Sequence, residues 1–193
     1  MKPMRTFALL FVLLSVSACS HMPRMESAHD TLSPAEHRKL GEAYLSHGEK
    51  KAAREQYEMA LEGDSHSITA LVSLGNIAFE ENNLKKSRRY FREALKIDPG
   101  NAAIVNNLAM VDVMEGKHLT RAKALLDQAL PTAGPTTPYL LDTLANIAIL
   151  EGRMADASQA LDQAEAAAPK SDADFPKHIQ ETREKITRRT QKT

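Results

Sequence analysis

A two-residue phrase recurs along this chain as Leu40-Gly41, Leu74-Gly75, Leu108-Ala109 and Leu144-Ala145. Successive copies are separated by 34, 34 and 36 residues. About a dozen residues after each phrase comes a small residue, then an aromatic residue or leucine, then an alanine. A fixed period in this range is typical of a solenoid, in which each repeat packs against its neighbours. The sequence therefore predicts a repeat protein, and the functional question becomes which partner it binds.

The composition fits one domain and argues against nucleic-acid binding. The chain has 193 residues, of which 42% are hydrophobic and 5% aromatic. This length is enough for one domain with its own core. The 25 basic and 25 acidic residues give a formal net charge of zero. Because nucleic-acid-binding proteins normally carry a basic surplus, we expect no nucleic-acid partner.

The start of the chain has the pattern of a secretory leader. Lys2 and Arg5 precede a short apolar run at residues 7–14. This run is too short to span a bilayer as a stable helix but suits a signal peptide.

The end of this leader resembles the bacterial lipobox in the stretch Val16-Ser17-Ala18-Cys19. The resemblance implies that residues 1–18 are a lipoprotein signal peptide and that Cys19, the only cysteine, carries acyl chains such as palmitate. Ser20 stands where an Asp would favour the inner membrane, so the resemblance implies an outer-membrane anchor with the protein facing the periplasm. The alternative is an ordinary secretory leader with a chance cysteine.

The folded part is predicted to begin near residue 33. Residues 19–33 lack apolar periodicity, which indicates a flexible tether that starts at the lipidated cysteine. Ser33, Pro34 and Glu36 then form a helix start, with a capping serine, a proline at the first helical position and a glutamate as capping-box partner.

From Pro34 onward the sequence resembles the tetratricopeptide repeat (TPR), a helix-turn-helix unit of 34 residues. The resemblance implies an all-α, right-handed solenoid over residues 34–171. The four repeats span 34–67, 68–101, 102–137 and 138–171. Residues that tolerate a positive φ stand at the turns inside the repeats, at Gly48, Asn82, Gly116 and Gly152. The large packing residues of the second helices are Tyr57, Phe91, Leu126 and Leu161.

The third repeat departs from this pattern. It has an extra residue between Gly116 and Ala122, and residues 131–138 are rich in proline and glycine, so we expect an irregular turn and exit. Asp112 stands on a packing face, where exposure at the edge of a groove is one interpretation.

A capping helix is predicted within residues 172–193. Phe175, Ile179 and Ile186 mark a narrow apolar stripe, which suits the exposed end of a solenoid. Its basic end contains Arg183, Lys185, Arg188, Arg189 and Lys192. This end suits either anionic lipid head groups or an acidic partner, or is a solvated helix terminus favoured by the helix dipole.

The sequence contains no enzyme motif that we recognise, neither a zinc-protease motif nor a phosphate-binding loop nor a nucleophile elbow. The seven histidines are scattered without metal-ligand spacing, and we interpret them as solvated surface residues. We therefore expect a non-enzymatic protein without metal, cofactor or small-molecule substrate.

In TPR arrays the first helices line a concave groove, and the resemblance places a peptide-binding site there. The corresponding residues are Arg38, Glu42, Leu45, Asn76, Phe79, Asn106, Met110, Tyr139 and Asn146. Three of them, the asparagines, would form one row whose amides can both donate and accept hydrogen bonds to a peptide backbone. The alternative is that they are ordinary solvated helix residues.

The best-known TPR site, a basic clamp for a terminal carboxylate, is not supported. Arg38 fits one clamp position, but Glu42, Ala103 and Asn107 replace the other expected residues. The apolar residues of the groove instead suit an amphipathic helix or an apolar strand.

Small TPR lipoproteins of this layout resemble the pilotin-like assembly factors of type IV and tight-adherence (Flp) pili. The resemblance implies an adaptor that helps a secretin reach or assemble in the outer membrane. The alternative function is an adaptor that scaffolds peptidoglycan hydrolases or proteases in cell-wall turnover.

Overall fold

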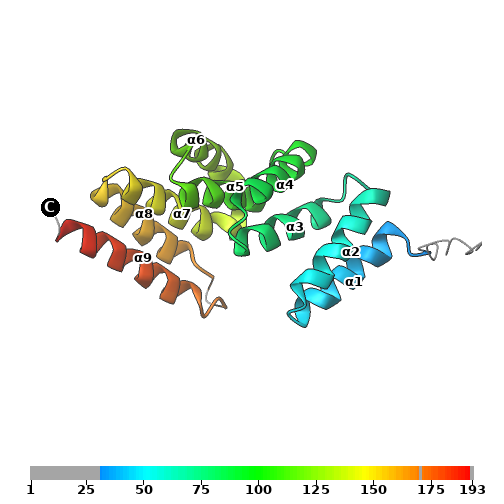
Figure 1. The fold of residues 1–193 in the computed structure, drawn as a ribbon. Helices are drawn as coiled ribbons and strands as arrows, with labels where there is room; N and C mark the ends of the chain where they lie inside the picture. The colour runs from blue at the N-terminus through cyan, green and yellow to red at the C-terminus, as the bar shows by residue number, and fades with distance from the viewer. Residues whose placement is uncertain (1–30, 170, 192–193) are drawn as a thin grey trace, which may run out of the picture. The chain divides into compact units, whose positions relative to one another are not determined.

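Helices make up nearly all of the chain that the computed structural model describes, residues 31–169 and 171–191 (Figure 1). They are α1 Pro34–Ser46, α2 Lys50–Gly63, α3 Ile68–Glu80, α4 Leu84–Ile97, α5 Ala102–Glu115, α6 Leu119–Ala129, α7 Thr137–Leu150, α8 Met154–Ala167 and α9 Phe175–Thr190. No strand occurs in these two ranges, which confirms the predicted all-α class. The predicted signal peptide, Cys19 and most of the tether lie outside the described residues.

The first eight helices form four antiparallel pairs, one in each predicted repeat. The turn inside each pair has a left-handed residue at the corresponding position, with φ of 77° at Gly48, 58° at Asn82, 63° at Gly116 and 77° at Gly152. These are the four positions at which the sequence predicts a residue that tolerates a positive φ. The chain reverses there within about three residues, so the two helices of a pair pack side by side.

The predicted helix start is confirmed at α1. Oγ of Ser33 accepts the backbone N–H of Glu36, and the Glu36 carboxylate accepts the backbone N–H of Ser33. These two bonds satisfy two backbone donors that a helix terminus leaves without partners. The Ser33 hydroxyl and the Ser33 backbone N–H both donate to Oε2 of Glu36 at 2.7 Å, which lowers the pKa of this carboxyl group.

The third repeat is irregular, as its sequence predicts. Its turn holds a second left-handed residue, His118, with a φ of 56°. Helix α6 ends early, at Ala129, and two 3-10 turns, η1 Leu130–Thr132 and η2 Gly134–Thr136, lead into α7.

Close contact between a small and a large residue holds the two helices of a pair together. A Cβ atom added to Gly75 of α3 would lie 2.5 Å from Cε1 of Phe91 in α4, and one added to Gly41 would lie 2.9 Å from Cε1 of Tyr57. The third and fourth repeats place Ala at the small position and Leu at the large one, and each such pair lies in a buried cluster. Glycine therefore occurs where the facing residue is aromatic.

The last cluster is covered by α9. Phe175 and Ile179 are 3% and 2% exposed and pack among buried residues of α7 and α8. The chain from Leu32 to Thr193 forms one compact unit, and all three buried clusters lie inside it. This part of the chain therefore has its own core. None of its described helices is long and apolar enough to cross a membrane.

Asp112 is buried, and not at a groove edge. Its side chain is 0% exposed and is held by two guanidinium groups. Nη2 of Arg88 in α4 donates to Oδ1 at 2.8 Å, and Nη2 of Arg121 in α6 donates to Oδ2 at 2.8 Å. The carboxylate therefore ties the second helices of repeats two and three to α5, since a buried charge requires such partners.

His37 also differs from its prediction as a solvated residue. It is 5% exposed, and its Nδ1 lies 2.9 Å from Oε1 of Gln56 in α2. The imidazole is thus part of the α1–α2 contact.

The contact between Gly75 and Phe91 predicts a specific coupling between the two positions. Gly75→Ala adds a methyl group to a filled space, which costs about 1–3 kcal/mol, and gains about 1 kcal/mol of helix propensity. We expect a net loss of about 1 kcal/mol in the free energy of unfolding, measured by urea denaturation. Combining Gly75→Ala with Phe91→Leu recreates the Ala–Leu pair of repeats three and four. The double variant should therefore be more stable than the sum of the two single effects predicts, by about 1 kcal/mol.

Gly100→Ala is the control for this experiment, because an added Cβ at Gly100 meets no atom within 4 Å. Additive effects of Gly75→Ala and Phe91→Leu would show that this contact does not limit how closely the helices approach.

Candidate functional site

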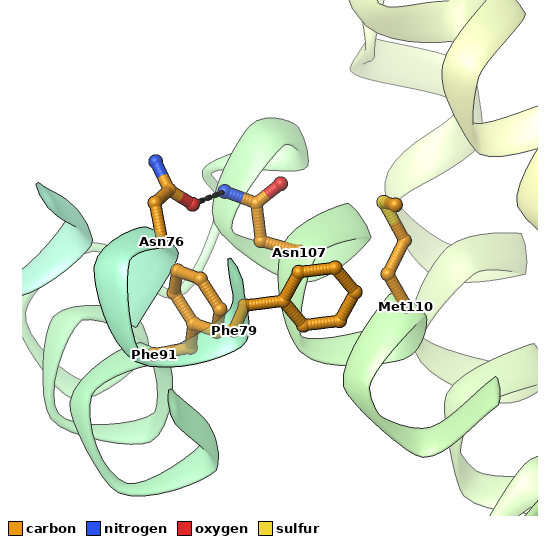
Figure 2. A pocket seen from close by; sticks show the side chains of 5 residues that line it. All are labelled: Asn76, Phe79, Phe91, Asn107 and Met110. Atoms are coloured by element: carbon orange, nitrogen blue, oxygen red, sulfur yellow. Dashed lines mark hydrogen bonds between the residues drawn. The ribbon is translucent and has the colours of Figure 1, made fainter. Parts of the chain in front are cut away.

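A small hollow lies between the first helices of repeats two and three (Figure 2). It measures about 70 Å³ and is lined by Asn76, Phe79, Phe91, Asn107 and Met110. Figure 2 shows the two asparagine amides meeting through a hydrogen bond, with the Phe79 ring and the Met110 side chain facing each other beside them.

A second hollow of about 230 Å³ adjoins the first. It is lined by Phe79, Met110, Val113, Met114, Asp142, Thr143, Asn146, His178 and Lys185. Because Phe79 and Met110 line both hollows, the two are neighbours, and together they extend along α3, α5, α7 and α9. We call the two hollows together the groove.

The middle of the groove is apolar and partly exposed. Met110 and Met114 lie one helical turn apart on α5 and are 37% and 60% exposed, beside the partly buried Phe79 and Val113. Methionine side chains are flexible and polarizable, and they adapt to apolar partners of different shape. This surface can therefore bury an apolar side chain of another molecule.

Two side-chain hydrogen bonds at the groove connect α3, α5 and α7. Asn107 Nδ2 donates to Asn76 Oδ1 at 3.3 Å, which connects α5 to α3. The Thr143 hydroxyl donates to Asn106 Oδ1 at 2.8 Å, which connects α7 to α5. Each of these amides therefore uses part of its hydrogen-bonding capacity inside the protein.

The groove ends at a cationic wall formed by α9. Lys185 Nζ donates to Oδ1 of Asn146 at 3.2 Å, and Nε2 of His178 lies 2.8 Å from Oδ2 of Asp142. Helix α9 thus occupies the place that the first helix of a further repeat would take. Oδ1 of Asp142 is buried and has no hydrogen-bond partner within the described chain.

The hydrogen bond with Asp142 raises the pKa of His178 above its ordinary value, against the opposing effect of burial. The Asp142 charge adds to the increase and Lys185 opposes it. His178 therefore holds its proton more firmly here than in an unfolded chain.

The groove contains four of the predicted site residues, Asn76, Phe79, Met110 and Asn146. Asn106 is placed differently from its prediction, since it is 7% exposed and accepts the Thr143 hydrogen bond. Helices α5 and α7 approach closely at this point, which buries the amide. The row of three asparagines open to a ligand is therefore not formed.

Four other predicted residues lie outside the two hollows. Arg38, Glu42 and Leu45 belong to α1, and Leu45 packs against the first buried cluster. Tyr139 donates its hydroxyl proton to Asp172 and packs edge-to-face on Phe175, with ring centroids 5.1 Å apart. Tyr139 therefore holds the segment before α9 in place. A role of these four residues in binding stays a prediction.

Eight groove residues were absent from the predicted site: Phe91, Asn107, Val113, Met114, Asp142, Thr143, His178 and Lys185. The position of Met114, one turn after Met110, was a usable signal in the sequence. His178 and Lys185 could be found only by treating α9 as the first helix of a further repeat. In the described part of the chain, no three His, Cys, Asp or Glu side chains come together as metal ligands would.

Two family models, both described as tetratricopeptide repeat, match residues 38–102 and 78–147. Tetratricopeptide repeat protein 8 of Homo sapiens is 29% identical over 118 residues, which is 61% of this chain and 20% of that protein. This chain thus spans about a fifth of the length of that curated relative.

Two solved structures share the fold. The crystal structure of PilW, a widely conserved type IV pilus biogenesis factor, has a TM-score of 0.65 at 24% identity, over 72% of this chain and 63% of PilW. PilF of Pseudomonas aeruginosa has a TM-score of 0.62 at 21% identity, over 82% of this chain and 73% of that one. The predicted solenoid is thereby confirmed.

The contact between His178 and Asp142 predicts that α9 docks more firmly at lower pH. Because the folded-state pKa of His178 is raised, its stabilising effect is complete below the unfolded-state pKa and disappears as the pH rises through the folded-state value. We expect amide exchange in α9, relative to that in α7, to be slower at about pH 6 than at about pH 8.5 after correction for the intrinsic rate. The half-exposed imidazole limits the effect to a few tenths of a kcal/mol.

His178→Gln should abolish the difference in α9 amide exchange between the two pH values. His66→Gln, at an exposed position before α3, should keep this difference. The other charged groups near the imidazole are Lys185 and Glu181. A pH difference that persists in His178→Gln would assign it to another group.

Proposed function

We propose that this protein is an adaptor that binds a partner protein and holds a segment of it in the groove. The chain carries tetratricopeptide repeats and folds as a solenoid. One observation carries this proposal. Phe79, Met110 and Met114 present a partly exposed apolar surface in the groove, which extends along four helices. Exposed apolar surface in a concave site is typical of a place where another molecule binds.

The partner segment is an amphipathic helix or an apolar strand. Either can place apolar side chains against the methionines and polar groups against the amides of Asn76 and Asn107. The ammonium group of Lys185 favours a segment with an acidic residue at the α9 end of the groove.

The proposed setting is the assembly of a pilus or its secretin at the outer membrane. The fold shared with PilW and with PilF supports this setting, since PilW is described as a type IV pilus biogenesis factor. The lipobox-like stretch that ends at Cys19 supports a lipid anchor in the outer membrane, with the groove facing the periplasm. The proposed adaptor is not an enzyme, and it needs no cofactor.

Met110→Lys should abolish this function without unfolding the protein. An ammonium group in the middle of the groove would have to be buried without a partner when an apolar segment binds, so partner affinity should fall by about tenfold or more. The measurement is the amount of secretin multimers and pili in a deletion strain of the native host that expresses each variant.

Met59→Lys is the matched control. Met59 lies on α2, outside the groove, and its exposed fraction of 40% is close to the 37% of Met110. Met59→Lys should restore multimers and pili fully. Intact multimers and pili in the deletion strain itself would contradict the pilus role. Loss of hydrolase recruitment in that strain, with normal pili, would favour the cell-wall function.

Cys19→Ser should release the protein from the outer membrane. Without the thiol, the acyl chains that contribute about 0.8 kcal/mol per buried CH₂ cannot be attached. We expect the variant in the soluble periplasmic fraction and no incorporation of labelled palmitate. Unchanged fractionation with the outer membrane would contradict the lipid anchor and leave the groove proposal to the Met110 experiment.

A further inference from the structure

A second exposed surface of unusual chemistry lies on α4, away from the groove. Lys85, Arg89, Arg92 and Lys96 are spaced by four, three and four residues, so they lie on one face of the helix. All four side chains are exposed. They border an open hollow of about 350 Å³ together with Arg88 and Glu93. We call these four residues the α4 basic face.

The α4 basic face concentrates positive charge in a chain whose formal net charge is zero. In α4 as a whole, Glu93 is the only acidic residue, against Lys85, Lys86, Arg88, Arg89, Arg92 and Lys96. Glu93 pairs with Lys96 at 2.9 Å. Among the described residues, no carboxylate forms an ion pair with Lys85, Arg89 or Arg92.

The internal structure of α4 does not account for this charge. Like charges three or four residues apart on a helix repel each other and weaken it. The one basic residue that serves the core is Arg88, which turns inward to bind Asp112 and Glu115. The Arg89 guanidinium lies over the Tyr90 ring, 4.8 Å from its centroid, which positions it without neutralising it.

The basic end of α9, the other candidate for a cationic surface, is largely neutralised within the protein. Arg183 pairs with Asp162 and Glu165 of α8. Arg188 pairs with Glu184 on its own helix. Arg189 donates to the backbone carbonyl of Ile149 at 2.7 Å, in the last turn of α7. Apart from Lys185 at the groove, the cluster of basic side chains without carboxylate partners in the described chain therefore lies on α4.

We propose that the α4 basic face binds the anionic head groups of a phospholipid surface. Protein–protein interfaces are enriched in arginine, methionine and aromatic residues but depleted of lysine. The two arginines of this face would suit a protein or a lipid surface, but its two lysines and the lack of any aromatic or other apolar residue among the four favour a lipid surface. Clustered Lys and Arg side chains bind anionic lipid surfaces through charge attraction, without an apolar anchor. This binding is independent of the groove and of Cys19.

The test uses residues 32–193, the part that contains all three buried clusters, and vesicles of phosphatidylcholine with or without roughly one-third phosphatidylglycerol. Near an anionic surface each cation strengthens binding about fivefold. We therefore expect a variant that lacks all four cations to bind the anionic vesicles at least about tenfold more weakly than the unmodified segment in a flotation assay. Its substitutions are Lys85→Gln, Arg89→Gln, Arg92→Gln and Lys96→Gln. Binding of the unmodified segment should also fall as salt rises from about 0.05 M to about 0.5 M.

The matched control is Lys39→Gln, Lys51→Gln, Lys117→Gln, Lys177→Gln, which removes the same charge from four exposed residues outside α4. It should bind within about threefold of the unmodified segment. Circular dichroism should show equal helicity for all three proteins.

Equal losses in the two variants, or equal binding to vesicles without phosphatidylglycerol, would overturn the proposal. It would also be overturned if the unmodified segment bound soluble polyglutamate but no anionic vesicles, since this would assign the α4 basic face to an acidic protein.

Discussion

The contact between the first and second helices of each pair is the constraint on which the rest of the structure depends. Gly75 lies against the Phe91 ring so closely that even a methyl group would overlap it. Because the large side chain fills the space that the small one leaves, the axes of the two helices are fixed relative to each other. Each first helix then presents one constant face outward, and successive faces form the walls of the groove.

The spacing between repeats determines which groove residues are available to a partner. Asn106 and Thr143 bond to each other because α5 and α7 approach closely, so the Asn106 amide is buried. Asn76 and Asn107 also bond to each other but remain at the surface of the hollow. Two adjacent asparagines on α5 thus have different roles, one inside the array and one at its surface. Their availability follows from the approach of the neighbouring helix.

Much of the fold could be predicted from the sequence because its signals are local. A positive φ at Gly48 or Asn82, or the capping box at Ser33, depends on residues within one turn. The site was predicted less well because it depends on partners far along the chain. Nothing near Asp112 in the sequence reveals that Arg88, 24 residues earlier, neutralises it. Tyr139 was assigned to the groove, but Asp172 and Phe175 hold it.

The repeat architecture also explains how a chain without net charge can carry two chemically distinct surfaces. In repeat two, residues 68–79 of the first helix contain no charged side chain, whereas residues 84–96 of the second helix contain seven. The first helix contributes to the groove, so apolar and amide groups gather there. The second helix turns its remaining face to solvent and can hold charge without affecting the groove.

Net charge averages over both faces, so it excludes a uniformly basic protein but says nothing about a single helix. The array can therefore hold a partner segment in its groove while α4 contacts an anionic surface, since no residue of the α4 basic face lines the groove.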